Sequence, residues 1–400
     1  MIFEPCFYSG KITPPPSKSY SHRALICAAS CKGEKSVIRN ILLCDDIGAT
    51  SDCLRELGAG IEFHGSTAEV TGTGLIPVKN TVFNCRESGS TLRFIMPFAM
   101  LSEYECSFRG DGRLLSRPLD VYESISEEQG LFFEREQDEI RVCGPMSTGL
   151  YRVDGSVSSQ FITGLMLSLG VSGDYSIIEI VPPVVSASYI GITVDVMRRF
   201  GFSVSVNDNR IIIDGSVIPR STDITVEADW SAAAHVMAFN MTGSDIEICG
   251  LNGESCQGDR IIRAIFGRMR RCRPTVDISD CPDLAPVIMA VAPFYHGVTL
   301  ISTDRLNDKE SRRGEAMAEE LEKFGVSAAI GNDRIDVEPA SELIKPSLPV
   351  SSHNDHRIAM ACAVLLSHTG GELTGSESVS KSYPGFFSEL SRLRILSKDM

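Results

Sequence analysis

The sequence has no hydrophobic run long enough to cross a bilayer. Its longest apolar stretches are Ile177–Val185 and Ile358–Leu366, whereas a membrane-spanning helix needs about 20 apolar residues. The amino terminus also lacks the charged start and apolar run of a signal peptide. We therefore expect a cytoplasmic protein with no membrane partner.

Basic residues are scarce. The chain has 38 Lys and Arg against 52 Asp and Glu, which gives a formal net charge of -14. Nucleic acid would meet an average repulsion from this charge, so we expect no nucleic-acid partner. Small-molecule substrates remain, and an anionic substrate would need a local group of basic residues.

The 13 cysteines are scattered without CxxC spacing, in a chain of 400 residues that is far longer than a small disulfide scaffold. We expect reduced and mostly buried thiols. His353 and His356 are three residues apart beside Asp355, but no other His or Cys has the spacing of a metal-binding set. We therefore expect no metal site.

An internal repeat indicates the architecture. Four times, an amphipathic helical pattern ends at a glycine and continues as alternating residues around a polar turn, which predicts a helix followed by a hairpin. These glycines are Gly58, Gly130, Gly201 and Gly325. The first three are about 70 residues apart, and the longer gap before the last leaves room for a degenerate copy over residues 260–280.

Six copies fit the length, and we expect an α/β protein with two lobes of about three copies each. The boundary is predicted near Thr222–Glu227, between the third hairpin and a new helical pattern. The first lobe would span 15–226, and the second would combine 1–14 with 227–400. A cleft between similar lobes is a natural ligand site, so we place the active site there.

Two segments look suited to anions. Lys18 and Ser19 follow a proline run at the start of a helical pattern, with Arg23 on the face of Ser19. Gly89 lies in a serine-rich segment that opens another apolar helix. Helix amino termini supply free N–H groups to oxyanions, and glycine permits close approach. For either segment alone, an ordinary capped helix is the plainer interpretation.

Other basic and polar clusters follow along the chain, and each by itself is more often structural than functional. Together they resemble the 5-enolpyruvylshikimate-3-phosphate synthase family of enolpyruvyl transferases over essentially the whole chain. The matching peptides are PPSKSYSHRALICAA, GSVSSQFITGLM, KES followed by Arg313, NDHRIAMA and SKSYPGFF. The resemblance implies an inverse α/β prism of two lobes, each built from three helix-and-strand units.

The resemblance also implies a reaction. The enolpyruvyl group of phosphoenolpyruvate would pass to the 5-hydroxyl of shikimate 3-phosphate with release of phosphate, a step toward chorismate and the aromatic amino acids. It implies no cofactor, and we expect a monomer. The residues implied for shikimate 3-phosphate are Lys18, Ser19, Arg23, Ser158, Ser159, Gln160, Ser186, Tyr189, Asp283 and Lys309. Those implied for phosphoenolpyruvate are Lys18, Gly89, Arg113, Gln160, Arg313, Arg357 and Lys381.

Three residues are candidates for the chemistry. We expect Asp283 to accept the proton of the attacking hydroxyl, and Lys309 and Glu310 to manage proton transfer at the methylene carbon and the leaving phosphate. Without the resemblance, Asp283 would be read as a helix cap after Pro282, and Lys309 with Glu310 as a surface pair.

The sequence departs from the family pattern at Glu87, Asn307 and Arg312, to which no role is transferred. One alternative is the sister transferase that acts on UDP-N-acetylglucosamine, but the segment RGDGRLLSRP lacks that enzyme's reactive cysteine. The other is a non-catalytic anion-binding relative, which the retention of Asp283, Lys309 and Glu310 disfavours.

Overall fold

The computed structural model describes residues 1–395. The chain divides into two compact units, Pro16–Glu227 and Met1–Pro15 with Ala228–Met400. We refer to them as the central unit and the terminal unit. Each has its own hydrophobic core of buried residues.

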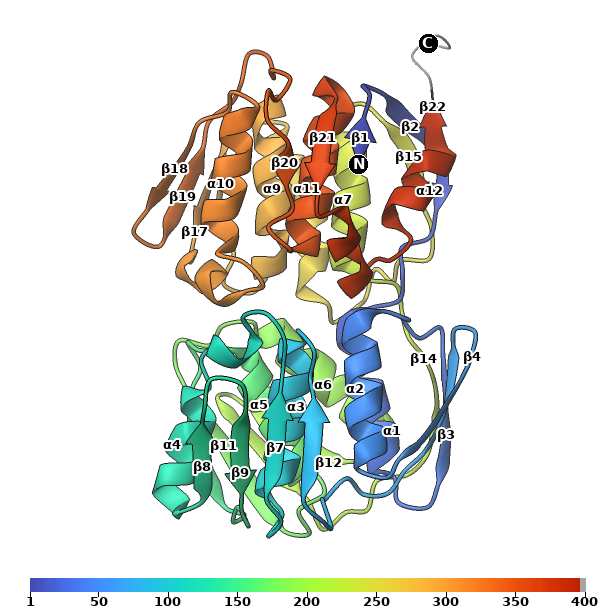
Figure 1. Ribbon diagram of the computed structural model, residues 1–400, viewed down its shortest axis with the longest axis vertical. Helices are drawn as coiled ribbons and strands as arrows, with labels where there is room; N and C mark the ends of the chain where they lie inside the picture. The colour runs from blue at the N-terminus through green and yellow to red at the C-terminus, as the bar shows by residue number, and fades with distance from the viewer. Residues whose placement is uncertain (396–400) are drawn as a thin grey trace. The chain divides into compact units, whose positions relative to one another are not determined.

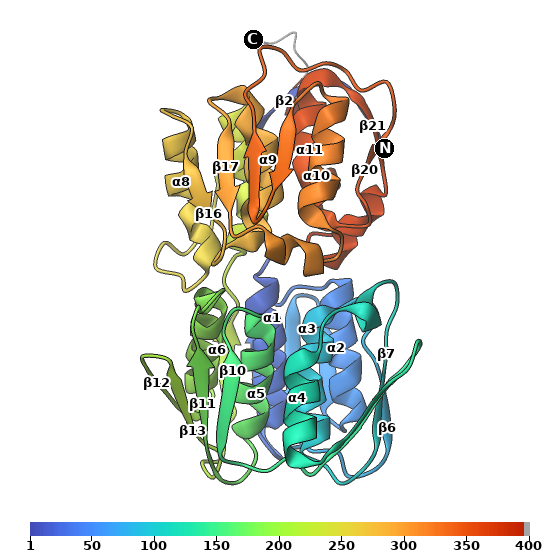
Figure 2. The ribbon, with the colours of Figure 1, turned by 90° about the vertical axis from the view of Figure 1, so that its left-hand side faces the viewer.

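The central unit contains three four-stranded sheets of one design (Figures 1 and 2). Their strand orders are β14-β3-β5-β4, β6-β7-β9-β8 and β10-β11-β13-β12. In each sheet the first two strands are parallel and the remaining pairs antiparallel. The strands are β3 Lys35–Arg39, β4 Gly60–His64, β5 Thr67–Thr71, β6 Thr81–Asn84, β7 Cys106–Arg109, β8 Phe132–Arg135, β9 Ile140–Cys143, β10 Leu150–Asp154, β11 Tyr175–Val181, β12 Ser203–Asn207, β13 Arg210–Asp214 and β14 Asp223–Thr225.

Helices fill the space between these sheets (Figure 2). They are α1 Lys18–Ser30, α2 Asp45–Glu56, α3 Gly89–Met100, α4 Asp120–Gln129, α5 Ser159–Leu169 and α6 Ala187–Arg199, with the short 3-10 helix η1 Leu114–Ser116. Helices α1, α3 and α5 are buried over almost their whole length. Helices α3 and α5 are apolar on most sides and therefore need such a position. Helix α1 also buries polar side chains, His22 and Arg23 among them.

The repeat is longer than the pattern in the sequence. In the second and third copies the order is strand, helix, strand, helix and hairpin, whereas the sequence pattern predicted only the second helix and its hairpin. Those parts are confirmed. Gly130, for example, ends α4 in the left-handed conformation with φ 66°, which glycine adopts without the steric cost that a side chain brings. The first helix was missed as part of the repeat because an all-round apolar helix has no amphipathic period.

The terminal unit also contains three sheets, with strand orders β16-β17-β19-β18, β15-β2-β22 and β1-β21-β20. The strands are β1 Ile2–Phe3, β2 Phe7–Ile12, β15 Asp245–Ile248, β16 Thr275–Asp277, β17 Val298–Ile301, β18 Ala328–Gly331, β19 Arg334–Val337, β20 Val350–Ser351, β21 Gly371–Thr374 and β22 Arg394–Ile395. Segments from the ends of the chain therefore complete the last two of these sheets.

The helices of the terminal unit are α7 Trp230–Met241, α8 Ile262–Met269, α9 Ala285–Val291, α10 Arg313–Lys323, α11 His356–Thr369 and α12 Phe386–Leu393. Short 3-10 helices lie between them: η2 Gly258–Ile261, η3 Pro282–Leu284, η4 Ala292–Phe294, η5 Asp304–Asp308 and η6 Ser376–Lys381. The predicted degenerate copy over 260–280 is α8 followed by the single strand β16, which pairs with β17 in parallel. A hairpin was wrongly expected there, because this strand opens the next sheet.

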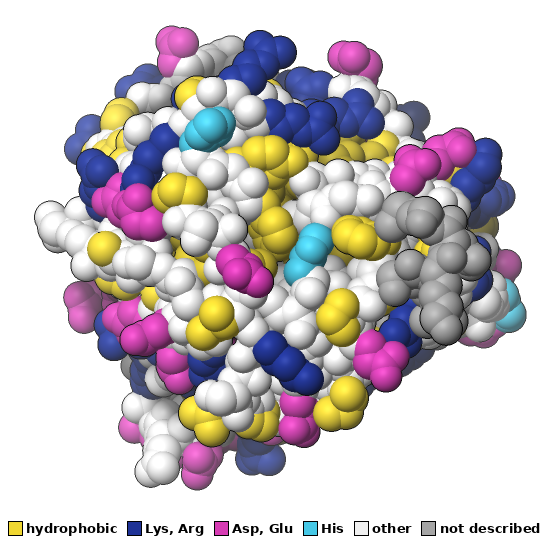
Figure 3. All heavy atoms as spheres, turned by 90° about the horizontal axis from the view of Figure 1, so that it is seen from above, with side chains coloured by type: hydrophobic (Ala, Val, Ile, Leu, Met, Phe, Trp, Pro, Cys, Tyr) yellow, Lys and Arg dark blue, Asp and Glu magenta, His cyan; other side chains and the backbone are white. Residues whose placement is uncertain are grey.

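The α/β prediction is confirmed by these elements. Each of the 13 cysteines is a free thiol, and eight of them are buried as expected. Among the helices of residues 1–395, none combines the length and apolar character that a bilayer span requires. The face of the molecule seen in Figure 3 carries side chains of both charge signs interspersed with hydrophobic ones.

Candidate active site

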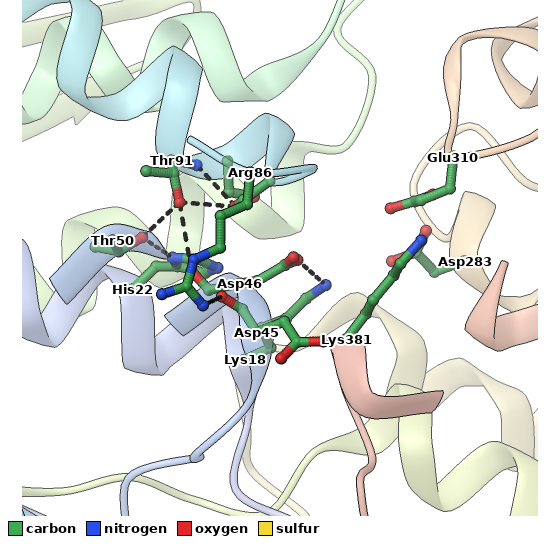
Figure 4. A network of polar contacts seen from close by, with 12 residues as sticks. Lys18, His22, Asp45, Asp46, Thr50, Arg86, Thr91, Asp283, Glu310 and Lys381 are labelled. Carbon is green, nitrogen blue, oxygen red and sulfur yellow. Dashed lines mark hydrogen bonds and ion pairs between the residues drawn. The ribbon is translucent and has the colours of Figure 1, made fainter. Parts of the chain in front are cut away.

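Lys18 opens helix α1 in the central unit. Its Nζ lies 2.7 Å from Oδ2 of Asp46, a residue of the first turn of α2 (Figure 4). Both side chains are mostly buried, with 16% and 13% of their surface exposed. A partly desolvated ion pair is oriented more firmly than a surface one. Lys18 is therefore held at the amino-terminal ends of two neighbouring helices.

A chain of hydrogen bonds links three helices behind Lys18 (Figure 4). His22 Nδ1 lies 2.7 Å from the Thr50 hydroxyl, which lies 2.7 Å from the Thr91 hydroxyl. Thr91 continues to Ser88 Oγ at 2.7 Å, and Ser88 also accepts from the Thr91 N–H at the start of α3. Burial, with Lys18 and Arg23 nearby, lowers the pKa of His22 well below its ordinary value, so the ring is neutral. This connection could not be recognised in the sequence, because residues on three separate helices make it.

Arg23 is 2% exposed and connects α1 with α5 and α6. Its Nε donates to the Thr193 hydroxyl at 2.8 Å, and its Nη2 donates to the Thr163 hydroxyl at 3.1 Å. Its guanidinium also lies 5.0 Å from the centre of the Phe94 ring. Burial lowers the pKa of Arg23 to about 10, which still leaves it charged at neutral pH. Several N–H groups of Arg23 therefore already donate to residues of the central unit.

Gln160 lies between the first turns of α3 and α5. Its Oε1 accepts from Arg93 Nη1 at 2.7 Å, and its Nε2 donates to Ser90 Oγ at 3.0 Å. These two contacts fix which end of the amide faces which neighbour. Gly89 borders the same group, because a β-carbon placed there would lie 3.8 Å from Gln160 Oε1. The structure therefore brings the predicted residues Gly89 and Gln160 together.

Two arginines approach Gly89. A β-carbon on Gly89 would lie 2.8 Å from Arg117 Nη1 and 3.4 Å from Arg93 Nη1. Arg113, the arginine predicted for phosphoenolpyruvate, is exposed and precedes η1, and half-buried Arg117 follows η1. The role of Arg113 stays a prediction.

The remaining predicted residues of the central unit also lie at helix starts. Ser158 caps α5, and its Oγ accepts from the Gln160 N–H at 3.3 Å, with Ser159 buried as the first helical residue. Ser186 precedes α6 in the left-handed conformation with φ 56°, and its carbonyl accepts from the Tyr189 N–H. A non-glycine residue in this conformation is uncommon and often marks a functional turn.

In the terminal unit, Asp283 is the carboxylate around which cations gather. Its Oδ1 lies 2.9 Å from Arg313 Nη1 and 3.7 Å from Lys309 Nζ. Its Oδ2 lies 2.8 Å from Arg357 Nη2. The structure therefore brings together four predicted residues from η3, the segment after η5, α10 and α11.

Arg313 is 1% exposed and joins Asp283 to two further carboxylates. Its Nη2 lies 2.5 Å from Glu310 Oε2, and its Nε lies 2.9 Å from Asp355 Oδ2. Asp355, fully buried, also caps α11 by accepting from the Arg357 N–H at 2.9 Å. The sequence analysis noted Asp355 only as a neighbour of two histidines and missed its contact with Arg313.

Two lysines complete this group. Burial lowers the pKa of Lys309 to about 8, although Asp283 acts in the opposite direction. Its ammonium therefore loses its proton at a lower pH than an ordinary lysine. Lys381 ends η6, and its Nζ donates to the Asn354 carbonyl at 2.7 Å, one residue before Asp355.

A buried polar group from α7 and η2 was also missed. The Ser231 hydroxyl donates to Asp259, and Asp259 is 3% exposed. Burial and then the nearby Asp283 charge raise the pKa of Asp259 to about 7, while Arg357 opposes this. The charge of Asp259 therefore interacts with the Asp283–Arg357 pair. Ser231 and Asp259 lie too far apart in the sequence to form a recognisable motif.

The residues that depart from the family pattern lie around these groups. Arg312 is exposed and pairs with Glu315 at 3.2 Å. Asn307 is half-buried within η5. Glu87 packs against Gly112, since a β-carbon on that glycine would lie 2.6 Å from Glu87 Oε1.

Two groups of side chains in residues 1–395 have carboxylate and imidazole atoms close enough to share a metal ion. The first is Glu62, His64 and Glu69 on β4 and β5, where Lys35 pairs with Glu69. The second is Glu319, Glu320 and His353, where Lys323 pairs with Glu320. In both groups an ammonium already neutralises a carboxylate, which disfavours a second cation.

The pattern of the EPSP synthase (3-phosphoshikimate 1-carboxyvinyltransferase) family matches residues 7–390. The chain belongs to the EPSP synthase family. A 3-phosphoshikimate 1-carboxyvinyltransferase of Clostridium kluyveri is 37% identical over 411 residues, which cover 97% of this chain and 96% of the relative. The enzyme of the same name from Clostridium novyi is 36% identical over 421 residues, with the same coverage of 97% and 96%. The family resemblance seen in the sequence is confirmed.

Two solved structures share the fold of this chain. The EPSP synthase of Acinetobacter baumannii superposes with a TM-score of 0.77 at 21% identity, covering 98% of this chain and 97% of that one. The enolpyruvyl transferase NikO from Streptomyces tendae gives a TM-score of 0.75 at 13% identity, covering 98% and 96%. At these identities the likeness concerns the fold alone, and it agrees with the predicted α/β architecture of the family.

Proposed function

We propose that this chain transfers the enolpyruvyl group of phosphoenolpyruvate to the 5-hydroxyl of shikimate 3-phosphate and releases phosphate, within the shikimate pathway. Membership of the EPSP synthase family over residues 7–390 carries this proposal. The basic side chains gathered around Asp283 support it, because the reaction brings two phosphates and two carboxylates together against their mutual repulsion. The net charge of -14 disfavours nucleic acid as a partner. Small anions fit this charge better, because local groups of basic side chains can attract them.

We assign shikimate 3-phosphate mainly to the helix starts of the central unit. The proposed contacts are Lys18, Ser19, Arg23, Ser158, Ser159, Gln160, Ser186 and Tyr189. The N–H groups in the first turns of α1, α5 and α6 favour anionic or polar ligand groups there, because a helix does not pair these groups internally. Asp283 and Lys309 are proposed as further contacts from the terminal unit.

Phosphoenolpyruvate is assigned to Lys18, Gly89, Gln160, Arg313, Arg357 and Lys381. Arg113 is assigned to the same substrate, and the approach of Arg117 to the position of Gly89 supports Arg117 as a further arginine beside it. Arginine forks suit both the phosphate and the carboxylate of this substrate.

For the chemistry, we propose that Asp283 accepts the proton of the 5-hydroxyl as its oxygen bonds to C2 of phosphoenolpyruvate. Lys309 and Glu310 would deliver a proton to C3, giving a tetrahedral adduct, and assist when a proton returns from that carbon and phosphate leaves. The position of Asp283 among Arg313 and Arg357 supports this role, because the same cations can bring the anionic substrates to this carboxylate.

The first experiment is phosphate release by the purified protein with both substrates, each omitted in turn. Release that requires both phosphoenolpyruvate and shikimate 3-phosphate is expected. UDP-N-acetylglucosamine replaces shikimate 3-phosphate in a parallel assay. Release with that acceptor alone would assign the chain to the sister transferase, and release with neither would indicate a non-catalytic relative.

The role of Asp283 is tested by Asp283→Asn, which removes the charge at nearly constant volume. We expect kcat to fall by about 100-fold or more, the range typical of a lost general base. Asp308→Asn, at an exposed position beside Lys309, is the control and should keep normal turnover. An Asp283→Asn variant with near-normal kcat would contradict the assignment.

A further inference from the structure

Glu320 is a carboxylate of α10 that is completely buried. Its Oε1 lies 2.7 Å from His353 Nε2, and its Oε2 accepts from the Ser351 N–H at 3.0 Å. Lys323 Nζ lies 2.8 Å from the same Oε2. Burial acts to raise the pKa of Glu320, but the hydrogen bonds from His353, Lys323 and Ser351 outweigh it and lower the pKa. The buried group is therefore an anion with each oxygen paired.

The partners of Glu320 lie in a tight turn, Ser351–Asp355, which we call the His353 turn. His353 and Asn354 both have positive φ, 49° and 56°. Two consecutive non-glycine residues in the left-handed region are strained, and such a conformation persists only where surrounding contacts enforce it. Ser352 supplies one such contact, because its carbonyl accepts from the Asp355 N–H at 2.8 Å. Glu320 supplies two more, to Ser351 and His353.

The His353 turn contacts three residues assigned to phosphoenolpyruvate, through the side chains of Lys381 and Arg313 and the backbone N–H of Arg357. The Asn354 carbonyl accepts from Lys381 Nζ at 2.7 Å. The Asp355 carboxylate accepts from Arg313 Nε at 2.9 Å and from the Arg357 N–H at 2.9 Å. A change in the turn would therefore move all three cations together.

Helix α10 contacts this turn at two points. Arg313 in its first turn binds Asp355, and Glu320 binds Ser351 and His353. Residues seven apart lie on the same face of a helix, so both contacts come from one side of α10. The hydrogen bond to Glu320 raises the pKa of His353, which favours the charged imidazolium and strengthens the second contact.

We propose that Glu320 and His353 are positioning residues for phosphoenolpyruvate: they fix the His353 turn so that Arg313, Arg357 and Lys381 are held in the arrangement that binds this substrate. The proposal rests on the proposed function. Neither residue is assigned a contact with the reacting atoms, so their loss should affect binding of one substrate more than turnover.

The test uses Glu320→Gln and His353→Gln in the full chain, with Glu322→Gln as a control on the exposed side of the same helix. We expect KM for phosphoenolpyruvate to rise roughly 5- to 20-fold in both variants, with kcat and KM for shikimate 3-phosphate changed less than about 2-fold. The double variant should be no worse than the more severe single one, since both substitutions weaken the same contact between Glu320 and His353. Unchanged KM for phosphoenolpyruvate, an equal rise for both substrates, or the same rise in Glu322→Gln would overturn the proposal.

Amide hydrogen exchange gives a second readout that needs no substrate. Faster exchange at Ser351, Asn354 and Asp355 in Glu320→Gln than in Glu322→Gln is expected, and equal exchange would overturn the proposal. Failure of the proposed function is recognised separately, because the wild-type protein would then release no phosphate with either acceptor. A wild-type protein that is active, together with variants of normal KM, would refute the positioning role alone.

Discussion

At the scale of single residues, the small space around residue 89 explains why this residue is a glycine. A β-carbon there would lie 2.8 Å from Arg117 Nη1 and 3.4 Å from Arg93 Nη1. Both neighbours are ends of flexible side chains, so they can shift while the backbone stays in place. The glycine is therefore required by the arrangement of the arginines and not by the conformation of α3.

Gly89→Ala should fold normally and bind phosphoenolpyruvate poorly. We expect KM for this substrate to rise about 10-fold or more as Arg117 is displaced, since a loss of about 1.4 kcal/mol in binding is a factor of 10. The free energy of unfolding should change by less than about 1 kcal/mol. Steady-state kinetics and chemical denaturation measure the two effects.

Gly191→Ala is the matched control, because a β-carbon on this glycine of α6 would have no heavy atom within 4 Å. It should leave KM unchanged. Equal KM values for the two alanine variants would contradict the role given to the space beside Arg117.

Lys309 should give the enzyme a pH dependence. Its pKa is lowered to about 8, so the ammonium is present below that pH and is lost as the pH rises through it. If the ammonium is the active form, kcat/KM should fall about 10-fold per pH unit above 8, because this parameter reports ionisation of the free enzyme. Lys309→Arg keeps its charge over this range and should have no such falling limb, whatever its absolute rate. A wild-type profile that is flat to pH 9.5 would contradict the prediction.

At the scale of elements, buried polar side chains determine how the helices of the central unit are joined. Arg23 donates from α1 to Thr163 of α5 and Thr193 of α6, and the His22–Thr50–Thr91 chain joins α1, α2 and α3. An unpaired buried donor or acceptor is costly, which favours the arrangement of helices in which these side chains find their partners. The helix starts that carry the predicted ligand residues are therefore aligned by side chains behind them.

Arg23→Lys tests this alignment. A lysine ammonium cannot reproduce the planar fork that reaches Thr193 and Thr163 together, and it would leave buried hydroxyls poorly paired. We expect the free energy of unfolding to fall by about 2–3 kcal/mol in urea denaturation. Arg199→Lys, at a position 50% exposed in α6 and paired with Asp195, should cost less than about 0.5 kcal/mol. A similar small loss in both variants would argue against a joining role for Arg23.

At the scale of the whole molecule, the chain builds two separate hydrophobic cores. Phe108 stacks on Phe83 in the core of the central unit, with ring centres 4.9 Å apart. Phe239 lies in the core of the terminal unit, edge-on to Tyr8 at 5.0 Å. Each core is covered by the sheets of its own unit. A substitution that destabilises one core should therefore lower the stability of that unit more than that of the other.

Phe108→Ala and Phe239→Ala should each destabilise mainly one unit. Truncation of a buried phenylalanine typically costs about 3–5 kcal/mol. Hydrogen exchange followed by mass spectrometry should therefore show lost protection concentrated in Pro16–Glu227 for the first variant and in Ala228–Ile395 for the second. Equal loss across both units in either variant would show that the cores unfold as one.

The sequence by itself determined four segments in which a helix is followed by a hairpin, the glycines such as Gly130 near which these helices end, and the peptides that carry the family resemblance. These features depend on local periodicity and backbone preference, and both can be recognised from residues that are close together in the sequence. The tertiary structure alone decided that Arg117 lies beside Gly89, that Asp355 binds Arg313, and that Glu320 contacts the His353 turn. Such contacts join residues far apart in the chain, and only the packing of helices and sheets brings their side chains within hydrogen-bonding distance.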